Sequence, residues 1–255
     1  MFISSTVNYF LDPKSMSLKN KTALITGASS GIGEACAYAL KEEGARLILT
    51  GRNKIKLEEL AKKMDASFVV ADLQDNSEIE KLFNEAGTSI DILVNNAGIA
   101  PSASIIDGDI SSFKDLLEVN VLALTHCCQL ALKKFDSISG GQIVNISSMS
   151  GHRVPPSGGF YAATKFAVRA VTEALRFELK AQNNKTRVTM ISPGFVDTPL
   201  LEKYFASDQE KLKKLRLELK MLDPNDIAET IKFILKTPKH VEIGDILLRP
   251  QDQKI

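Results

Sequence analysis

The residues best suited to acid–base chemistry are a tyrosine and a lysine four positions apart, Tyr161 and Lys165. On a helix this spacing places both side chains on one face, so the ammonium group can reach the space beside the phenol. A free tyrosine titrates at about pH 10, and a nearby positive charge lowers that pKa. The pair is therefore suited to exchanging a proton with an alcohol or carbonyl oxygen. The same spacing is common on ordinary surface helices, so the pair needs support from other residues.

Two polar residues upstream give that support. Ser148 follows an apolar stretch, thirteen positions before Tyr161, and its hydroxyl could hold a substrate oxygen. Asn120 lies inside the most apolar helical segment of the chain, Ser111–Phe135. A buried amide needs hydrogen-bond partners, so Asn120 suits either a water relay or a structural bond to a neighbouring strand.

A glycine-rich turn near the start of the sequence is suited to binding a pyrophosphate. Residues 26–33 read Thr-Gly-Ala-Ser-Ser-Gly-Ile-Gly and separate an apolar strand from a helix. Backbone N–H groups at the start of a helix, together with its positive end, attract phosphate. The spacing departs from the general Gly-x-Gly-x-x-Gly fingerprint, and a structural tight turn is the alternative. The position of the turn favours a dinucleotide site, with expected contacts from Gly27, Ser29, Ser30, Gly31, Ile32 and Gly33.

The end of the second expected strand favours a dinucleotide that carries a 2′-phosphate. An acidic residue about 20 positions past the glycines would bond the ribose hydroxyls and repel that phosphate. This chain instead has Gly-Arg-Asn-Lys at 51–54 and no acidic residue before Glu58. Arg52 can stack on adenine and pair with the phosphate. The sequence therefore predicts NADP(H) rather than NAD(H), with a solvated basic turn as the alternative.

Alternating strand and helix patterns predict the scaffold that positions these residues. The expected strands are Thr22–Thr26, Arg46–Thr50, Ser67–Val70, Ile92–Asn95, Gln142–Ser147, Arg187–Ile191 and Ile246–Leu248. Helical patterns such as Gly33–Glu43, Ile55–Met64 and Ser77–Ala86 lie between them. Short apolar strands separated by helices indicate a parallel sheet covered on both faces. We predict an α/β fold with a doubly wound parallel sheet (a Rossmann fold), as a single domain over residues 18–255 preceded by an extension at 1–17.

Composition argues against several kinds of partner. The net charge is +1 and the chain has no tryptophan and four tyrosines, so neither nucleic acid nor a membrane surface is an expected partner. No apolar run approaches the roughly 20 residues of a membrane span. The cysteines Cys36, Cys127 and Cys128 form neither a disulfide framework nor a metal motif. We expect no metal site, inert buried thiols and a cytoplasmic location.

The stretches named above, together with Asn95–Gly98 and Pro193-Gly194, resemble the short-chain dehydrogenase/reductase family over residues 19–250. The resemblance implies a catalytic tetrad of Asn120, Ser148, Tyr161 and Lys165, in which Lys165 also binds the nicotinamide ribose. An oxidised nicotinamide ring would then add a second positive charge beside the phenol. Beyond the glycine turn and Arg52, it implies cofactor contacts from Asp72, Leu73, Asn96, Ala97, Gly98, Tyr161, Lys165, Pro193, Gly194, Val196 and Thr198.

A narrower resemblance concerns Ser148–Pro155 and Thr237–Pro250. These stretches are similar to the branch that includes dehydrogenase/reductase member 11, insect farnesol dehydrogenases and bacterial NADP-dependent 3-hydroxy acid (serine) dehydrogenases. This implies hydride transfer between NADP(H) and a small alcohol or carbonyl substrate. A 3-hydroxy acid is one candidate and a farnesol- or steroid-type alcohol is another. A non-catalytic dinucleotide sensor on the same fold is the alternative from a different class.

Three further features bear on substrate choice and assembly. The segment 195–222 mixes apolar residues with lysines and is expected to be an amphipathic lid over the nicotinamide. Arg153 is a candidate clamp for a substrate carboxylate. The helix Ser111–Phe135 is apolar on nearly every side and is expected to be buried all round. A second helix, Tyr161–Lys180, is rich in alanine, and the two together predict a homo-oligomer, a tetramer or a dimer.

Overall fold

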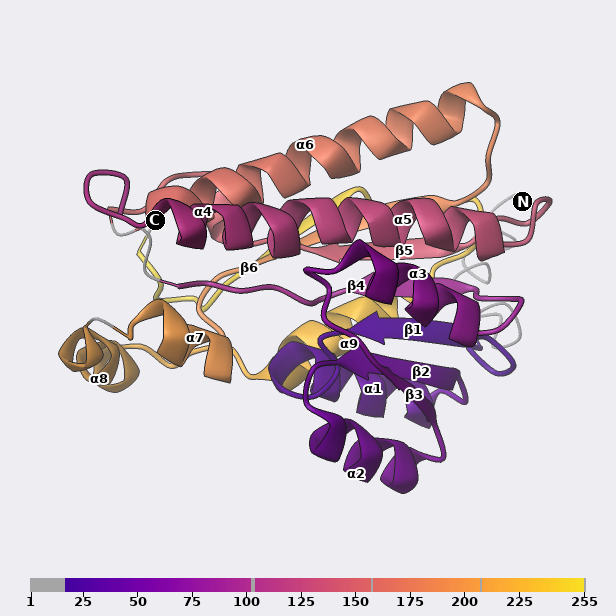
Figure 1. The fold of residues 1–255 in the computed structure, drawn as a ribbon, viewed down its shortest axis with the longest axis horizontal. Coiled ribbons are helices and arrows are strands. Elements are labelled where there is room, and N and C mark those ends of the chain that lie inside the picture. The colour runs from indigo at the N-terminus through magenta and orange to yellow at the C-terminus, as the bar shows by residue number, and fades with distance from the viewer. Residues whose placement is uncertain (1–16, 102–103, 157, 207, 255) are drawn as a thin grey trace, which may run out of the picture.

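Seven short strands form one parallel sheet in the order β3-β2-β1-β4-β5-β6-β7 (Figure 1). This computed structural model describes residues 17–101, 104–156, 158–206 and 208–254. Apart from Ser17, the predicted extension 1–17 lies outside the described residues. The strands are β1 (Thr22–Thr26), β2 (Arg46–Gly51), β3 (Ser67–Val70), β4 (Ile92–Asn95), β5 (Gln142–Ile146), β6 (Arg187–Pro193) and β7 (Asp245–Leu248). Every pair of neighbouring strands runs parallel.

Helices connect the strands and cover both faces of the sheet (Figure 1). They are α1 (Gly31–Glu42), α2 (Lys54–Met64), α3 (Asn76–Glu85), α4 (Ile110–Leu117), the π-helical turn η2 (Glu118–Leu122), α5 (Ala123–Lys134), the 3₁₀ turn η3 (Met149–Gly151), α6 (Gly159–Ala181), α7 (Pro199–Tyr204), α8 (Gln209–Glu218) and α9 (Pro224–Leu235). The side chains of Asn53, Asp75 and Asp109 accept hydrogen bonds from the first turns of α2, α3 and α4. The first turn of α1 has no such side-chain cap.

Alternate residues of the inner strands pack into two cores, one on each face of the sheet. Along β1, Ala23 and Ile25 belong to the core shared with α1, α2 and α9, whereas Leu24 belongs to the core shared with α3, α5 and α6. All residues of β1 and β4 are buried. A strand that is covered on both faces is typically apolar along most of its length. The predicted α/β fold with a doubly wound parallel sheet is confirmed.

The predicted strands agree with the observed ones to within two residues at their ends. The largest difference is at β6, which extends to Pro193 because Ser192 and Pro193 pair with Leu247 and Leu248 of β7. The three cysteines are free and buried, as predicted. Burial raises the pKa of each thiol well above its ordinary value, so these thiols are poor nucleophiles.

The predicted helix Ser111–Phe135 forms as α4, η2 and α5 without interruption. Within the described part of the chain it is the one helix long and apolar enough, by length and composition, to cross a bilayer. Here it packs against β4, α3 and α6. Within one copy of the chain the helix is not buried all round, because Leu117 and Leu122 are 40% and 53% exposed on the sides that these elements leave uncovered.

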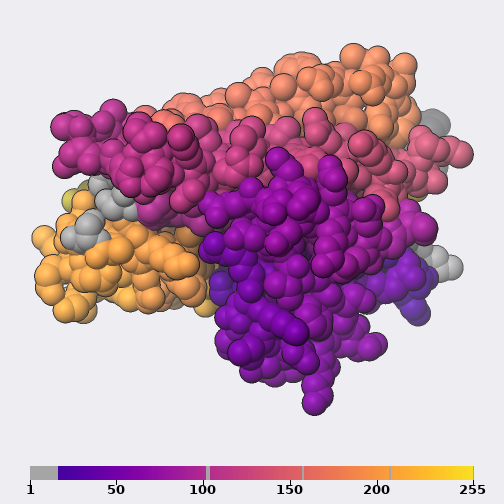
Figure 2. All heavy atoms as spheres, in the orientation of Figure 1, coloured from indigo at the N-terminus to yellow at the C-terminus, as the bar shows by residue number. Residues whose placement is uncertain are grey.

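The carboxyl ends of the strands face α7 and α8 (Figure 1). In the space-filling view, α7 and α8 form a lobe beside the beginning of α4 (Figure 2). Between β1 and β4 the strand order reverses direction. In open sheets of this kind the crevice at such a reversal binds the ligand. The fold therefore places the candidate site at this end of the sheet.

Candidate active site

Two adjoining cavities lie at the carboxyl ends of the strands. The first, of about 470 Å³, is lined by residues that follow β5 and β6 and by residues of α6 and α7. The second, of about 460 Å³, is lined by residues that follow β1, β2 and β3. The residues that line both are Ile32, Asn96, Gly98, Ile99, Thr198 and Leu200. A long ligand could therefore occupy both cavities at once.

The glycine turn forms one end of the second cavity. Gly27 and Gly31 have φ angles of +63° and +57°, a conformation that favours glycine. A Cβ atom on Gly33 would collide with the carbonyl oxygen of Gly27. Gly33 therefore allows α1 to pack closely on the turn, and it lines neither cavity. Because no side chain caps α1, its first N–H groups can bind an anion, which fits a pyrophosphate.

Asn96 fixes this turn to the end of β4. Its Nδ2 donates to the carbonyl oxygens of Thr26 and Gly27, at 3.0 and 3.1 Å. The hydroxyl oxygen of Thr26 accepts from the backbone N–H groups of Asn96 and Ala97, both at 3.0 Å. The predicted cofactor residues after β1 and β4 thus form one hydrogen-bonded unit.

Arg52 and Asp72 line the far part of the second cavity together. A guanidinium nitrogen of Arg52 lies 3.8 Å from a carboxylate oxygen of Asp72, and the two side chains are 59% and 39% exposed. Lys56 and Lys203, which the sequence analysis did not single out, line the same cavity. The cations at this end fit a phosphate group beyond the adenosine.

Tyr161 and Lys165 lie on one face of α6 in the first cavity, and both are buried. The Nζ atom of Lys165 is 5.7 Å from the centre of the Tyr161 ring, and it donates to the carbonyl oxygen of Ile146 at 3.0 Å. The Ser148 hydroxyl hydrogen-bonds the phenol. The structure therefore brings together three of the four residues predicted to be catalytic.

Burial dominates the protonation of this group. It raises the pKa of the Tyr161 phenol, against a lowering by the hydrogen bond from Ser148, and the neighbouring Tyr204 adds to the rise. Burial also lowers the pKa of the Lys165 ammonium group to about 8. Among the protein groups, burial thus outweighs the lowering of the phenol pKa that was expected from Lys165. That lowering needs a further positive charge, such as an oxidised nicotinamide ring provides.

Asn120, the fourth predicted residue, lies behind the cavity wall and lines neither cavity. It sits in the π-helical turn η2. Its Oδ1 accepts from the backbone N–H of Ile99 at 2.9 Å, and its Nδ2 donates to the Ile99 carbonyl and to the Thr164 hydroxyl at 3.0 and 3.2 Å. Of the two alternatives considered for Asn120, the geometry matches the structural bond to the segment after β4.

The wall of the first cavity opposite the cofactor side is mostly apolar. It includes Ala100, Met149, Pro155, Phe195, Leu201, Tyr204, Phe205 and Leu215. The ring of Tyr204 meets the ring of Tyr161 edge-on, with centres 5.7 Å apart. Tyr204 therefore stands directly beside the phenol and limits the width of the site there. The amphipathic helices α7 and α8 form in the predicted lid segment and pack around Leu201, Phe205 and Leu212.

The cavities include most of the predicted contacts and several residues that were missed. Apart from Gly33 and Asn120, every predicted site residue lines a cavity. Tyr204 and Gln253 line the first cavity but were not predicted as contacts, because each is brought there by packing between distant segments. Arg153, the candidate carboxylate clamp, lines the first cavity and donates to the backbone carbonyl of Lys254 at 3.0 Å.

A doubly wound sheet with a glycine turn in one cavity and a Ser–Tyr–Lys group in the next defines a dinucleotide-binding oxidoreductase. Residues 21–209 match the family model described as short chain dehydrogenase. The chain therefore belongs to the short-chain dehydrogenase/reductase family.

Relatives and solved structures agree with this assignment. The chain is 39% identical to the human protein named dehydrogenase/reductase SDR family member 11, over 92% of this chain and 96% of the relative. Its fold matches the closed form of serine dehydrogenase complexed with NADP⁺, with a TM-score of 0.86 and 29% identity over 92% of this chain and 96% of that one. It also matches an alcohol dehydrogenase from Thermococcus sibiricus complexed with 5-hydroxy-NADP, with a TM-score of 0.79 and 29% identity over 93% and 99% of the two chains.

Proposed function

We propose that this chain is an NADP(H)-dependent enzyme that transfers a hydride between the nicotinamide and the carbon of a small alcohol or carbonyl compound. The observation that carries the proposal is the position of the Ser148, Tyr161 and Lys165 group next to the place where the cavities adjoin. Gly98 lines both cavities, and a Cβ atom on it would lie 3.9 Å from the Nζ atom of Lys165. A substrate in the first cavity would thus lie beside the inner end of a dinucleotide in the second.

The proposed chemistry assigns one task to each polar group. Ser148 holds the substrate oxygen by a hydrogen bond, and Tyr161 Oη donates its proton to that oxygen in reduction or accepts the alcohol proton in oxidation. NADP(H), when bound, supplies or accepts the hydride and, when oxidised, adds a positive charge. Lys165 anchors α6 to the end of β5 through Ile146 and holds its own charge beside the phenol. The buried, apolar walls exclude water from the reacting atoms.

The preference for NADP(H) rests on Arg52 and on the absence of an acidic residue at the end of β2. Asp72 follows the neighbouring strand β3, and its carboxylate pairs with Arg52. Because the guanidinium offsets the negative charge of this carboxylate, Asp72 repels a 2′-phosphate less than an unpaired acid would. The solved structures that resemble this chain include complexes with NADP⁺ and 5-hydroxy-NADP, which supports the same choice. Arg52 and Lys56 are the residues proposed to hold the phosphate.

The substrate proposal has two candidates. A 3-hydroxy acid is favoured by Arg153 in the wall of the first cavity and by the resemblance to serine dehydrogenase. An uncharged alcohol of the farnesol or steroid type is favoured by the apolar wall and by the hydrogen bond that directs one nitrogen of Arg153 to Lys254. The alternative of a non-catalytic dinucleotide sensor gives no reason for a Ser–Tyr–Lys group in which the tyrosine and the lysine are buried.

We also propose a homo-oligomer, a tetramer or a dimer, that covers the outer sides of α4–α5 and α6. Leu122 on the first helix and Phe166 and Phe177 on the second are exposed large apolar residues. The three buried thiols support a cytoplasmic location.

Residues 195–222 are proposed to close as a lid, and limited proteolysis with and without NADPH tests this. Equal cutting rates in that segment would contradict it.

A substrate panel tests the proposed function. NADPH consumption or formation is followed by absorbance with L- and D-serine, other 3-hydroxy acids, diketones, farnesol and a steroid, each repeated with NADH. We expect turnover of at least one class and a preference for the phosphorylated cofactor. A protein that binds NADPH tightly but turns over none of these compounds would support the sensor instead.

A further inference from the structure

The segment that follows β7 lies against the wall of the first cavity. Gly194 continues the pairing of β6 with β7 by donating to the Leu248 carbonyl at 2.7 Å. The chain then turns, and the backbone N–H of Gln253 donates to the Pro250 carbonyl at 3.1 Å. This turn brings the Gln253 side chain into the cavity wall, together with Tyr161 and Ser148.

Contacts from two sides fix the position of this segment. A Cβ atom on Gly194 would collide with the side-chain oxygen of Gln253 and would lie 2.8 Å from Cβ of Arg249. The segment after β7 (residues 249–254, the C-terminal tail) thus packs so closely on Gly194 that no side chain fits there. From the other side, Arg153 donates to the Lys254 carbonyl at 3.0 Å. Gln253 is held between the segments that follow β5 and β6.

A backbone hydrogen bond determines which way the Gln253 amide points. Its Oε1 accepts from the backbone N–H of Phe195 at 2.9 Å. A backbone N–H can only donate, so the opposite assignment of oxygen and nitrogen would place two donors face to face. The Nε2 atom therefore points away from Phe195. It carries two donor hydrogens, and no residue in the described part of the chain accepts from it.

We infer that Gln253 is a substrate-recognition residue, which donates from Nε2 to a second oxygen of the substrate, apart from the reacting one. The chemical class is an alcohol or carbonyl compound with a further hydroxyl, carbonyl or carboxylate oxygen. This rests on the proposed function, because Ser148 and Tyr161 are assigned to the reacting oxygen. In a wall that is mostly apolar, an oriented amide donor increases the affinity for a substrate with an acceptor oxygen at the matching position. It also fixes which end of the substrate faces the phenol.

The test uses an isosteric change that keeps one half of the amide. Gln253→Glu retains an oxygen that can accept from Phe195, but it replaces the donor with a second acceptor. Gln251→Glu is the matched control: it makes the same change two positions earlier, on an exposed side chain that lines neither cavity. Hexan-2-one, hexane-2,3-dione and hexane-2,5-dione serve as substrates with NADPH, and the Kd of NADPH and the Tm are measured for all three proteins.

We expect Gln253→Glu to raise the KM of at least one dione about tenfold, as for a lost hydrogen bond plus repulsion between oxygens, with kcat little changed. The KM of hexan-2-one and the Kd of NADPH should change less than about twofold. An unchanged ratio of dione to monoketone KM, or the same change in Gln251→Glu, would overturn the inference. A weaker affinity for NADPH would overturn it too, because Gln253 would then act on the cofactor side. A wild-type protein that reduces none of the ketones would count against the proposed function, which is a separate result.

Discussion

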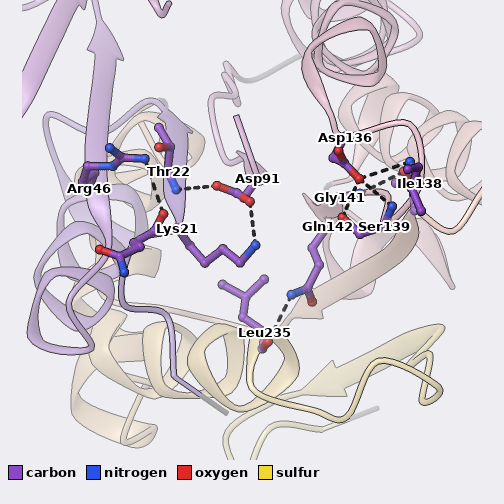
Figure 3. Close-up of polar contacts among 12 residues, drawn as sticks. Lys21, Thr22, Arg46, Asp91, Asp136, Ile138, Ser139, Gly141, Gln142 and Leu235 are labelled. Atoms are coloured by element: carbon purple, nitrogen blue, oxygen red, sulfur yellow. Dashed lines mark hydrogen bonds and ion pairs between the residues drawn. The ribbon is translucent and has the colours of Figure 1, made fainter. Parts of the chain in front are cut away.

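The two ends of the sheet use polar residues in opposite ways. At the amino ends, charged side chains such as Lys21 and Asp91 are partly exposed and hydrogen-bonded to their neighbours (Figure 3). Asp91 accepts from the Thr22 backbone and from Lys21 Nζ, at 2.9 and 2.7 Å, and Gln142 donates to the Leu235 carbonyl at 3.1 Å. At the carboxyl ends Lys165 is 5% exposed, and no carboxylate among the described residues pairs with its ammonium group.

This difference separates residues that stabilise the fold from residues that serve the site. Exposed pairs keep their water and contribute modestly to stability. A buried charge without a counter-ion reduces stability and shifts its own pKa. The lowered pKa of Lys165 indicates that burial of its charge reduces the stability of the fold. A cost of this kind is retained where chemistry needs the charge.

The largest effect on stability is expected from removing the buried ammonium group of Lys165, which lies at the carboxyl ends of the strands without a counter-ion in the described part of the chain. The pKa of Lys165 falls from 10.5 to about 8 on folding. The unfolded chain therefore binds more protons between these values, so wild-type stability rises with pH from 8 to 10.5. Lys165→Met lacks this gain in stability. The difference in the free energy of unfolding, wild type minus variant, should therefore rise by a few kcal/mol across this range.

Chemical denaturation in the absence of nucleotide, at pH 7.5 and 9.5, measures this difference. Exposed Lys180→Met on the same helix is the control and should show no such pH dependence. A flat difference for Lys165→Met would mean that folding does not lower the pKa of Lys165, so that its charge carries no burial cost, and the contrast between the two ends would fail.

At the opposite end, Asp91→Ala should lower the free energy of unfolding by about 1–2 kcal/mol, because it removes two hydrogen bonds, one of them to a partly exposed lysine. The kcat of the enzyme should stay unchanged, since the residue is at the far end of the strands. Asp107→Ala, at an exposed acid without an ion pair among the described residues, is the control for stability. A lower kcat of Asp91→Ala, measured where the variant is fully folded, would show that the amino ends of the strands affect the chemistry at the carboxyl ends.

The smallest effect is expected at the rim of the second cavity. Arg52→Ala should weaken NADPH binding about tenfold more than NADH binding, because NADPH alone carries the 2′-phosphate that pairs with the guanidinium, whereas stacking on adenine is common to both cofactors. Lys54→Ala, two positions on and outside both cavities, is the matched control. Fluorescence titration measures both cofactors, and equal losses for NADPH and NADH would reject the assignment of Arg52.

The sequence predicted what depends on local pattern. The strands were recognisable because burial on both faces gives them continuous apolar centres, as in Ala-Leu-Ile of β1 and Ile-Leu-Val of β4. The π-helical turn around Asn120 has no residue signature, since it depends on how α4 and α5 are joined. Gln253 could not be predicted, because its partner Phe195 is 58 residues away and the contact depends on the path of the chain after β7.

The roles of individual glycines also needed the structure. Gly33 and Gly194 were both predicted to contact the cofactor. The structure gives each a packing reason for lacking a side chain: Gly33 packs on the carbonyl of Gly27, and Gly194 packs on the tail. A glycine in a motif can reflect a positive φ angle, as at Gly27 and Gly31, or a neighbour that leaves no room for a Cβ atom, and only the structure shows which.

The central claim is that the Tyr161 hydroxyl exchanges the proton beside a bound nicotinamide. The most direct measurement is to compare turnover and NADPH affinity in Tyr161→Phe, using a substrate that the wild-type protein accepts. We predict that kcat falls by about 10³-fold or more while the Kd of NADPH changes less than about threefold, because the phenyl ring keeps the packing against Tyr204 and loses only the hydroxyl. Turnover within about tenfold of wild type would show that another group carries the proton.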